Sequence, residues 1–250
     1  MITMTKQHEV TAPTFLAQSF RFSDDPAAMA RFLELLGLGV LVSAGTGWYD
    51  LRGRSGSVAL HSTRNSDSGA AGGTTGLVLV APDVRRAAAQ LEQKGLRTRV
   101  WDESFGVQAA ARTPFGGELP INEEQRDFYG YQRHEPTPGP IDVVTVFFTD
   151  DLDGAARFFE LFGFRPDPAG SEDWHALRNG DRGVIGLHRS HDGRPSGTVG
   201  MSFETGEDLA VLADRLRAAG HRPILHDGDQ ARLEVTDPDG IGTEIWPSPL

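Results

Sequence analysis

The sequence predicts an α+β fold built from four copies of a βαβββ module, arranged as two similar domains in tandem. Two observations predict it. The chain has 250 residues, which is enough for two domains of roughly 120 residues each. In addition, the segment FLELLGL at Phe32–Leu38 recurs as FFELFGF at Phe158–Phe164, 126 residues later. Internal repetition of this kind indicates duplicated structural units.

The repeat extends well beyond this segment. The same offset carries Trp48 to Trp174, and the strand-like VALH at Val58–His61 returns one residue later as IGLH at Ile185–His188. We therefore expect a first domain over 12–130 and a second over 141–250. The linker over 131–140 is proline-rich, and proline can continue neither a helix nor a central strand.

The first copy divides into two similar parts. In the first part, a strand at Thr14–Phe22 precedes a helix that Asp24 or Asp25 can cap and that Gly37 ends. Short strands near 39–43, 48–52 and 57–62 follow. The second part has a strand near 76–80, a helix at Val84–Lys94, and strands near 97–100, 108–112 and 118–121.

The second copy has the same order of elements. Its first part has a strand at Asp142–Phe148, a helix at Leu152–Phe162 and strands up to His188. Its second part has a strand at Val199–Phe203, a helix at Glu207–Ala219 and strands up to Trp246. The predicted βαβββ unit is therefore present four times.

Composition narrows the class of protein. The formal net charge of −11 disfavours nucleic acid and anionic membrane as partners, because both require a cationic surface. The chain has no cysteine, which excludes disulfides, thiolate zinc sites and a cysteine nucleophile. No apolar run is long enough to span a membrane, and the polar start Met1–Thr11 reads as a frayed tail without a signal peptide. We expect a bacterial, cytoplasmic protein whose partner is a small molecule.

The order and spacing of these motifs resemble the glyoxalase/bleomycin-resistance, or vicinal oxygen chelate, superfamily. The resemblance rests on the repeated helix motif and on the stretch TDPDGIGTEI at Thr236–Ile245, and it covers nearly the whole chain. It implies that two βαβββ modules pair into one cupped mixed sheet per domain. Such a cup holds a divalent metal or binds a small molecule without one. The resemblance also implies dimeric pairing of domains, so a fused chain is expected to be a monomer or a homodimer.

The resemblance implies four metal-ligand positions per domain. In the first domain they fall on Gln18, Ala59, Gly76 and Pro120, and His61 lies two residues beyond Ala59 on the same face. Glutamine is the one side chain at these four positions that can ligate a metal.

In the second domain the four positions fall on Val144, Gly186, Gly200 or Met201, and Glu244, with His188 two residues beyond Gly186. A protein metal site needs about three or more ligands. We therefore expect largely lost metal sites and no cofactor, and leave a divalent metal open with Glu244 and His188 as its ligands. A glutamate held by a neighbouring arginine is the alternative for Glu244.

Five further residues are candidate ligand-binding groups besides His188. Trp48 and Trp174 are either walls on which a planar ligand stacks or core residues. His61 lines the first cup or is a strand-end residue retained after duplication, as is His188 in the second. Gln18 is a polar group at the first cup. His175 replaces Tyr49 of the first domain at a position expected to face the cup.

Three functions follow from this set. The first is a metal-independent binder that sequesters a drug or natural product. The second is a metal-dependent lyase, isomerase or ring-cleaving dioxygenase. The third is a metal-free enzyme that uses Glu244 or His175 as general acid or base. The sequence identifies no catalytic residue. The glycine-rich segment Asn65–Thr75 is expected to be a linker, or a lid over the first cup.

Overall fold

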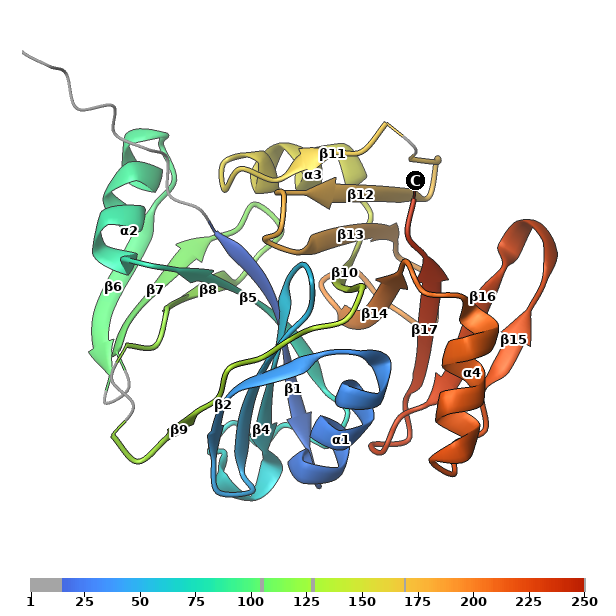
Figure 1. The fold of residues 1–250 in the computed structure, drawn as a ribbon. Helices are drawn as coiled ribbons and strands as arrows, with labels where there is room; N and C mark the ends of the chain where they lie inside the picture. The colour runs from blue at the N-terminus through green and yellow to red at the C-terminus, as the bar shows by residue number, and fades with distance from the viewer. Residues whose placement is uncertain (1–14, 104–105, 127–128, 169, 250) are drawn as a thin grey trace, which may run out of the picture.

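The computed structural model describes residues 15–103, 106–126, 129–168 and 170–249. These residues form two mixed β-sheets of nine and eight strands with four α-helices packed against them (Figure 1). The predicted frayed tail Met1–Thr11 and the first residue of the first predicted strand, Thr14, lie outside the described residues. Within the described ranges, none of the helices has the length and apolar character that a membrane crossing requires.

The first sheet contains the strands of the first two modules. Their bounds are β1 (Leu16–Ser23), β2 (Gly39–Ala44), β3 (Trp48–Arg52), β4 (Ser57–Ser62), β5 (Thr75–Ala81), β6 (Thr98–Glu103), β7 (Gly106–Arg112) and β8 (Glu118–Glu123), with β9 (Gln132–Arg133) added at one edge. The helices are α1 (Pro26–Leu36) and α2 (Val84–Gln93), and a 3₁₀ turn covers Thr63–Asn65.

The second sheet contains the other two modules. Its strands are β10 (Ile141–Thr149), β11 (Arg165–Pro166), β12 (Trp174–Arg178), β13 (Val184–Arg189), β14 (Val199–Thr205), β15 (Ile224–His226), β16 (Arg232–Thr236) and β17 (Gly242–Pro247). The helices are α3 (Leu152–Glu160) and α4 (Leu209–Ala218), with a 3₁₀ turn at Gly228–Gln230.

Each sheet joins two modules through their first strands. β1 runs antiparallel to β5, and β10 runs antiparallel to β14, while the last strand of each module lies parallel to its first. The observed order in the first sheet is therefore β6-β7-β8-β5-β1-β4-β3-β2-β9. The prediction of four βαβββ modules in two cupped mixed sheets is confirmed.

The first helix of each half begins and ends where the sequence indicates. The Asp25 side chain accepts a hydrogen bond from the Ala28 amide (2.9 Å), and Asp151 accepts one from Gly154 (2.8 Å). Gly37 adopts φ 108° at the end of α1, a left-handed conformation that favours glycine. The same local chemistry at equivalent positions thus defines the same helix twice.

The proline-rich linker returns along the edge of the first sheet. Arg133 and Gln132 pair with β2 at its outer side, where no further strand follows among the described residues. A side chain at Gly39 would lie only 2.8 Å from the Pro136 Cβ atom, so this glycine allows the linker to pass closely. An edge position suits a segment in which proline removes backbone donors.

The two halves are related by an approximate twofold axis. The hydroxyl oxygens of Ser19 and Thr145, which are equivalent residues of the repeat, lie 2.7 Å apart in the interior. On either side of this contact, the Ala17 amide donates to the Arg182 carbonyl (2.8 Å) and the Val143 amide donates to the Ser55 carbonyl (2.9 Å). Matched contacts of equivalent residues are what a twofold arrangement produces.

Each of the two large hydrophobic cores draws on both halves. One core combines side chains around α2 with side chains around α3, and includes Phe159 and Leu91. The other combines α1 with α4, which lie side by side in Figure 1, and includes Phe32 and Leu216. The predicted division at residues 131–140 separates the two sheets but not the cores. As a boundary between independently folding domains, it stays a prediction.

Candidate functional site

Strand alternation and register define one cup in each half. In the second sheet, Val144 and Val146 of β10 lie opposite Ser202 and Gly200 of β14, and directly paired residues point to the same face. We call this face the second cup, and the equivalent face of the first sheet, which carries Gln18 and Phe20, the first cup.

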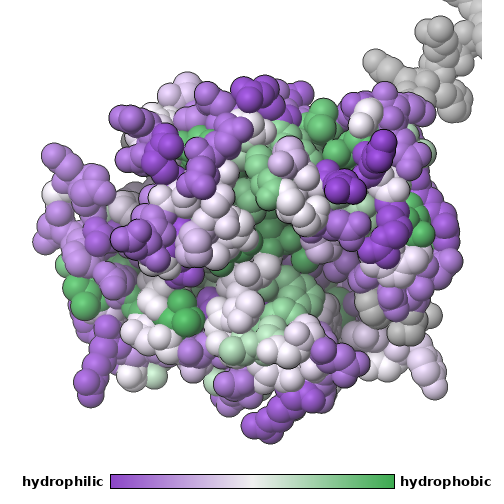
Figure 2. Space-filling model, turned by 180° about the vertical axis from the view of Figure 1, so that it is seen from behind, coloured by the Kyte–Doolittle hydropathy of each residue, from purple (hydrophilic) through white to green (hydrophobic). Residues whose placement is uncertain are grey.

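A cavity of about 780 Å³ lies in the second cup. This volume falls within the range of about 300–1,000 Å³ that small-molecule sites occupy. Seven of the apolar side chains that line it come from four different strands: Val144, Val146, Phe148, Trp174, Ala176, Val199 and Trp246. The molecular face shown in Figure 2 is hollowed near its middle, and the depth of that hollow is apolar while its rim is hydrophilic.

One wall of the cavity depends on a glycine. A Cβ atom built at Gly186 would lie 2.1 Å from the Trp174 ring, far inside van der Waals contact. Because Gly186 has no side chain, the Trp174 indole can lie across β13 and face the cavity. The position that the resemblance assigned to a metal ligand thus accommodates an aromatic wall instead.

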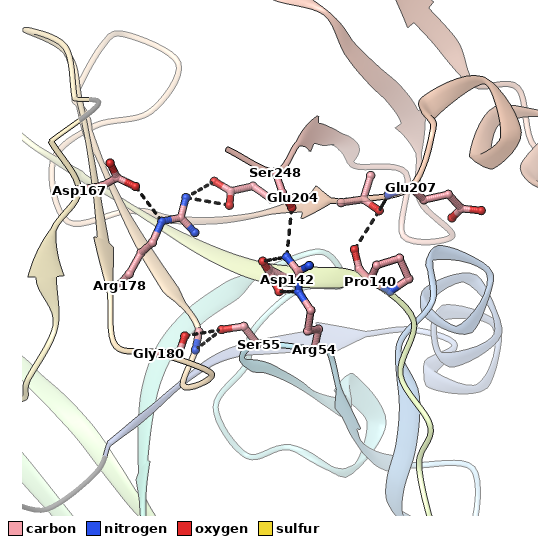
Figure 3. A network of polar contacts seen from close by, with 12 residues as sticks. Arg54, Ser55, Pro140, Asp142, Asp167, Arg178, Gly180, Glu204, Glu207 and Ser248 are labelled. Carbon is pink, nitrogen blue, oxygen red and sulfur yellow. Dashed lines mark hydrogen bonds and ion pairs between the residues drawn. The ribbon is translucent and has the colours of Figure 1, made fainter. Parts of the chain in front are cut away.

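Part of a charged network lines one end of the cavity, and Figure 3 shows the contacts of this network. Arg178 donates to Asp167 (3.0 Å) and to Glu204 (3.0 Å), and Glu204 lies directly opposite Asp142 on the neighbouring strand. Arg54 of the first half binds Asp142 through two nitrogens. Burial raises the pKa of the Glu204 carboxyl, and Arg178 opposes that rise. We call Asp167, Arg178 and Glu204 the charged end of the cavity.

Two further carboxylates on the β16–β17 side of the cavity have basic partners. Arg232 donates to Glu244 (3.1 Å), and the His226 ring nitrogen lies 3.2 Å from Glu234. Glu244 is thus held by a neighbouring arginine, as the alternative prediction for this residue states. Glu244 still lines the cavity, so its position agrees with the cup-facing register expected of it.

The other end of the cavity is surrounded by nitrogen-bearing side chains. The His188 ring lies 5.3 Å from the Phe148 ring and 6.1 Å from the Trp174 ring, between centroids. His191 packs edge-on against Phe148 at 5.8 Å, and the Arg194 guanidinium carbon lies 5.7 Å from the same ring. Arg21 reaches this end from β1 of the first half.

The first cup is occupied by its own side chains at the equivalent positions. Gln18 is buried and donates to Ser57 (3.1 Å) and to Asp50 (3.4 Å). Burial raises the pKa of the Asp50 carboxyl, and Arg52 and Gln18 oppose that rise. The Phe20 ring packs against Trp48 at 5.8 Å and against His61 at 6.1 Å. These contacts form a packed polar and aromatic cluster.

The predicted site residues therefore separate into two groups. Trp174, His188 and Glu244 line the second cavity, whereas Gln18, Trp48 and His61 lie in the first cup and do not border it.

His175 differs from its expected location. It follows Trp174, and since successive strand residues point to opposite faces, it lies outside the cup and borders a separate hollow against α3. The expectation that His175 faces the cup is corrected on this ground.

One end of the glycine-rich segment Asn65–Thr75 reaches the second cup, whereas its role as a linker or as a lid over the first cup stays a prediction. Its residues Gly73 and Thr75 border the second cavity, next to Arg21. The first half thus contributes part of the wall of the second cup.

Several cavity residues were not identified by sequence reasoning. Trp246 and Glu204 follow the strand period of two from Glu244 and Ser202, so alternation is a signal that points to both. Arg21 and Arg194 carry no such signal. Arg21 comes from the other half, and Arg194 lies in a turn that has no counterpart in the sequence repeat.

The structure is similar to solved ring-cleaving dioxygenases. It matches a catechol 2,3-dioxygenase with a TM-score of 0.61 at 16% identity, covering 93% of this chain and 87% of the other. An extradiol ring-cleaving dioxygenase from B. fuscum gives a TM-score of 0.62 at 18% identity, with 96% and 73% covered. A variant of homoprotocatechuate 2,3-dioxygenase from Brevibacterium fuscum gives 0.59 at 19% identity, with 95% and 72% covered. No protein-family model and no curated protein matches the sequence.

Three of the four expected ligand positions of the second cup carry no side chain that can bind a metal, and Glu244 is the fourth. Val144, Gly186 and Gly200 have no donor atom, and Ser202, opposite Val144, donates its hydroxyl to the Glu244 carbonyl (2.9 Å). Across the described ranges, no three His, Cys, Asp or Glu side chains gather as a metal-binding group. The predicted resemblance is confirmed at the level of the fold. The chain has the fold of these solved ring-cleaving dioxygenases, with its βαβββ modules paired in two cupped mixed sheets.

Proposed function

We propose that the protein binds a small planar aromatic compound in its second cup, and that this binding requires no metal ion. The observation that carries the proposal is the cavity of about 780 Å³, with Trp174, Phe148 and Trp246 on its walls. Aromatic walls favour planar ligands, because offset-stacked and edge-on ring contacts each contribute about 0.5–1.5 kcal/mol beyond the burial of area.

The donor set supports binding without a metal. Arg232 donates to Glu244, and the other expected ligand positions of the second cup carry valine, glycine, and glycine or methionine. A lone carboxylate binds divalent ions weakly. We propose that the physiological role of such a site is to sequester a drug or natural product. We also propose that the protein acts as a monomer.

The test is calorimetric titration with 2-naphthalenemethanol, a neutral bicyclic aromatic probe. We expect saturable binding that Trp174→Leu weakens by about tenfold, equivalent to about 1.4 kcal/mol. Trp48→Leu is the matched control, because it removes the equivalent tryptophan of the first cup and should leave the affinity unchanged. Absence of binding, or equal losses in the two variants, would count against the proposal.

A metal-dependent ring-cleaving or isomerising enzyme is the second candidate. It is favoured by one observation, namely that His188 and Glu244 line the same cavity. Elemental analysis of protein purified without chelators, together with a ring-cleavage assay on catechol in the presence of Fe(II) and oxygen, tests it. One equivalent of bound transition metal that is lost in the Glu244→Gln variant would favour this candidate over metal-independent binding.

A metal-free enzyme is the third candidate function. Glu244 is the acid or base candidate that faces the cavity, whereas His175 faces away from it.

A further inference from the structure

Nitrogen-bearing side chains gather at the end of the second cavity opposite the charged end. Arg21, His188, His191 and Arg194 surround this end, and we call them the cationic rim. On β10, Phe148 lies at the rim, whereas Asp142, six residues earlier, pairs with Glu204 at the charged end. At about 3.3 Å per strand residue, the two ends are about 20 Å apart.

A tight turn fixes two members of the rim. The His191 amide donates to the Arg194 carbonyl (3.1 Å), and the Arg194 amide donates to the His191 carbonyl (2.8 Å). Both side chains then lie against the Phe148 ring. Within the described part of the chain, no carboxylate lies within ion-pair distance of the Arg194 guanidinium. Arg194 is therefore a positioned cation whose charge is not matched by the protein itself.

Arg21 supplies a second guanidinium with an unused donor. Its side chain is only 1% exposed, and it donates to the Gly73 carbonyl and to Asp237 (3.1 Å). Its buried Nε atom has no hydrogen-bond partner. Burial lowers the pKa of Arg21, Asp237 and Asp239 oppose this, and the nearby charge of Arg194 lowers it further. A buried donor without a partner is costly, and an anionic acceptor nearby offsets that cost.

The remaining charged side chains of the cavity also favour an anionic ligand. Its four carboxylates, Asp167, Glu204, Glu234 and Glu244, all have a basic partner. Asp237 and Asp239 lie behind Arg21 and do not border the cavity. An anion at the rim therefore meets two arginines and two histidines, while each carboxylate that lines the cavity already has a basic partner. The apolar wall next to the rim consists of the Phe148 and Trp174 rings.

We propose that the cationic rim binds the carboxylate of an aromatic carboxylic acid, whose ring lies against Phe148 and Trp174. This inference rests on the proposed function and narrows it to an anionic class of ligand. Arginine suits this role, because its planar guanidinium matches a carboxylate and stays charged.

The experiment compares two probes of similar shape in calorimetric titrations: 2-naphthoate, which carries a carboxylate, and 2-naphthalenemethanol, which is neutral. The native protein should bind 2-naphthoate at least tenfold more tightly than the alcohol, and added salt should reduce this preference. Arg194→Gln should abolish the preference by weakening the binding of 2-naphthoate. Arg189→Gln is the matched control, because Arg189 pairs with Asp173 and does not line the cavity.

Arg194 is the test position because it is partly exposed, so its replacement does not remove a buried ion pair, as a change at Arg21 would. Equal affinities for the two probes, or a preference that persists in Arg194→Gln, would overturn the carboxylate site. If both probes bind equally and Trp174→Leu weakens the binding of both, the proposed aromatic binding site is supported and the carboxylate site is not. If neither probe binds, both proposals fail.

Discussion

The two cups share one backbone plan and differ in what fills them. Phe20 of the first cup corresponds to Val146 of the second, Gln18 to Val144 and Asp50 to Ala176, as the matched strand registers show. The larger side chains meet one another and form a packed cluster. The smaller ones leave a cavity. In a duplicated fold, a few side-chain volumes thus decide which copy retains a site.

The contacts between the halves differ in the same way. Arg21 pairs with Asp237 in a buried ion pair at the end of β1. At the equivalent position of β10, Phe147 packs against Phe115 with 5.6 Å between ring centroids. One side of the approximate twofold axis is therefore held by charge and the other by aromatic packing. The ion-paired side is the one that borders the cavity.

The largest expected effect comes from breaking this ion pair. Asp237→Ala leaves the Arg21 guanidinium buried without its carboxylate, and also removes the acceptor for the Asp239 and Ile241 amides. We expect the free energy of unfolding to fall by about 3–5 kcal/mol, as for other buried pairs that lose one partner. Urea denaturation measures it. Thr113→Ala, at the equivalent position of the first half, should cost less than about 1 kcal/mol. Comparable losses in the two variants would contradict the assigned asymmetry.

The next effect comes from filling the second cup as the first is filled. Val146→Phe places at this position the residue that the first cup has as Phe20. We expect the affinity for 2-naphthalenemethanol to fall by at least tenfold, because the new ring occupies the space of the ligand. The free energy of unfolding should change by less than about 1.5 kcal/mol, since the cavity accommodates the ring.

Phe20→Val is the reciprocal change and serves as the control. It enlarges the first cup and should leave the affinity for the probe unchanged. Titration of both variants, together with their urea denaturation, tells a filled cavity from an unfolded protein. Unaltered binding by Val146→Phe would place the ligand outside the second cup.

A smaller effect is expected at Gly186. Gly186→Ala introduces a methyl group into the space of the Trp174 indole, which must tilt into the cavity. We expect a loss of affinity of about three- to fivefold and a loss of stability of about 1 kcal/mol, at the low end for overpacking. Ala59→Gly, at the matching position of β4, should leave the affinity as it is. A Gly186→Ala variant that binds like the native protein would show that the flat indole is dispensable.

The fold could be predicted because its signals are local. The Asp25 and Asp151 caps, the glycine at position 37 and the repeated helix motif are each readable from a few neighbouring residues. The resemblance also implies a cup-facing position for Glu244, and Glu244 lines the second cavity. Strand register predicts the face on which a side chain lies, because successive side chains of a strand point to opposite faces.

The cavity could not be predicted in the same way. Its volume depends on how side chains from separate strands pack, and on Arg21, which comes from the other half of the molecule. The turn that positions Arg194 has no counterpart in the first copy, so comparison of the repeats gave no hint of it. The cup-facing position expected for His175 rests on its equivalence to Tyr49, whereas strand alternation from Trp174 assigns His175 to the opposite face.

The smallest expected effect concerns pH and the first cup. Burial raises the pKa of Asp50, so the folded state holds this proton more tightly than the unfolded state does. Stability is therefore lost as pH rises from about 4, the ordinary range of an aspartate, through the folded-state pKa.

Asp50→Asn removes this contribution, so the difference in unfolding free energy between about pH 4 and about pH 8 should narrow. The narrowing is partial, because Glu204 and Asp237 contribute in the same direction and remain. Asp102→Asn removes an exposed carboxylate and serves as the control. Urea denaturation across this pH range measures both variants, and a difference that widens in Asp50→Asn would mean that ionised Asp50 stabilises the first cup.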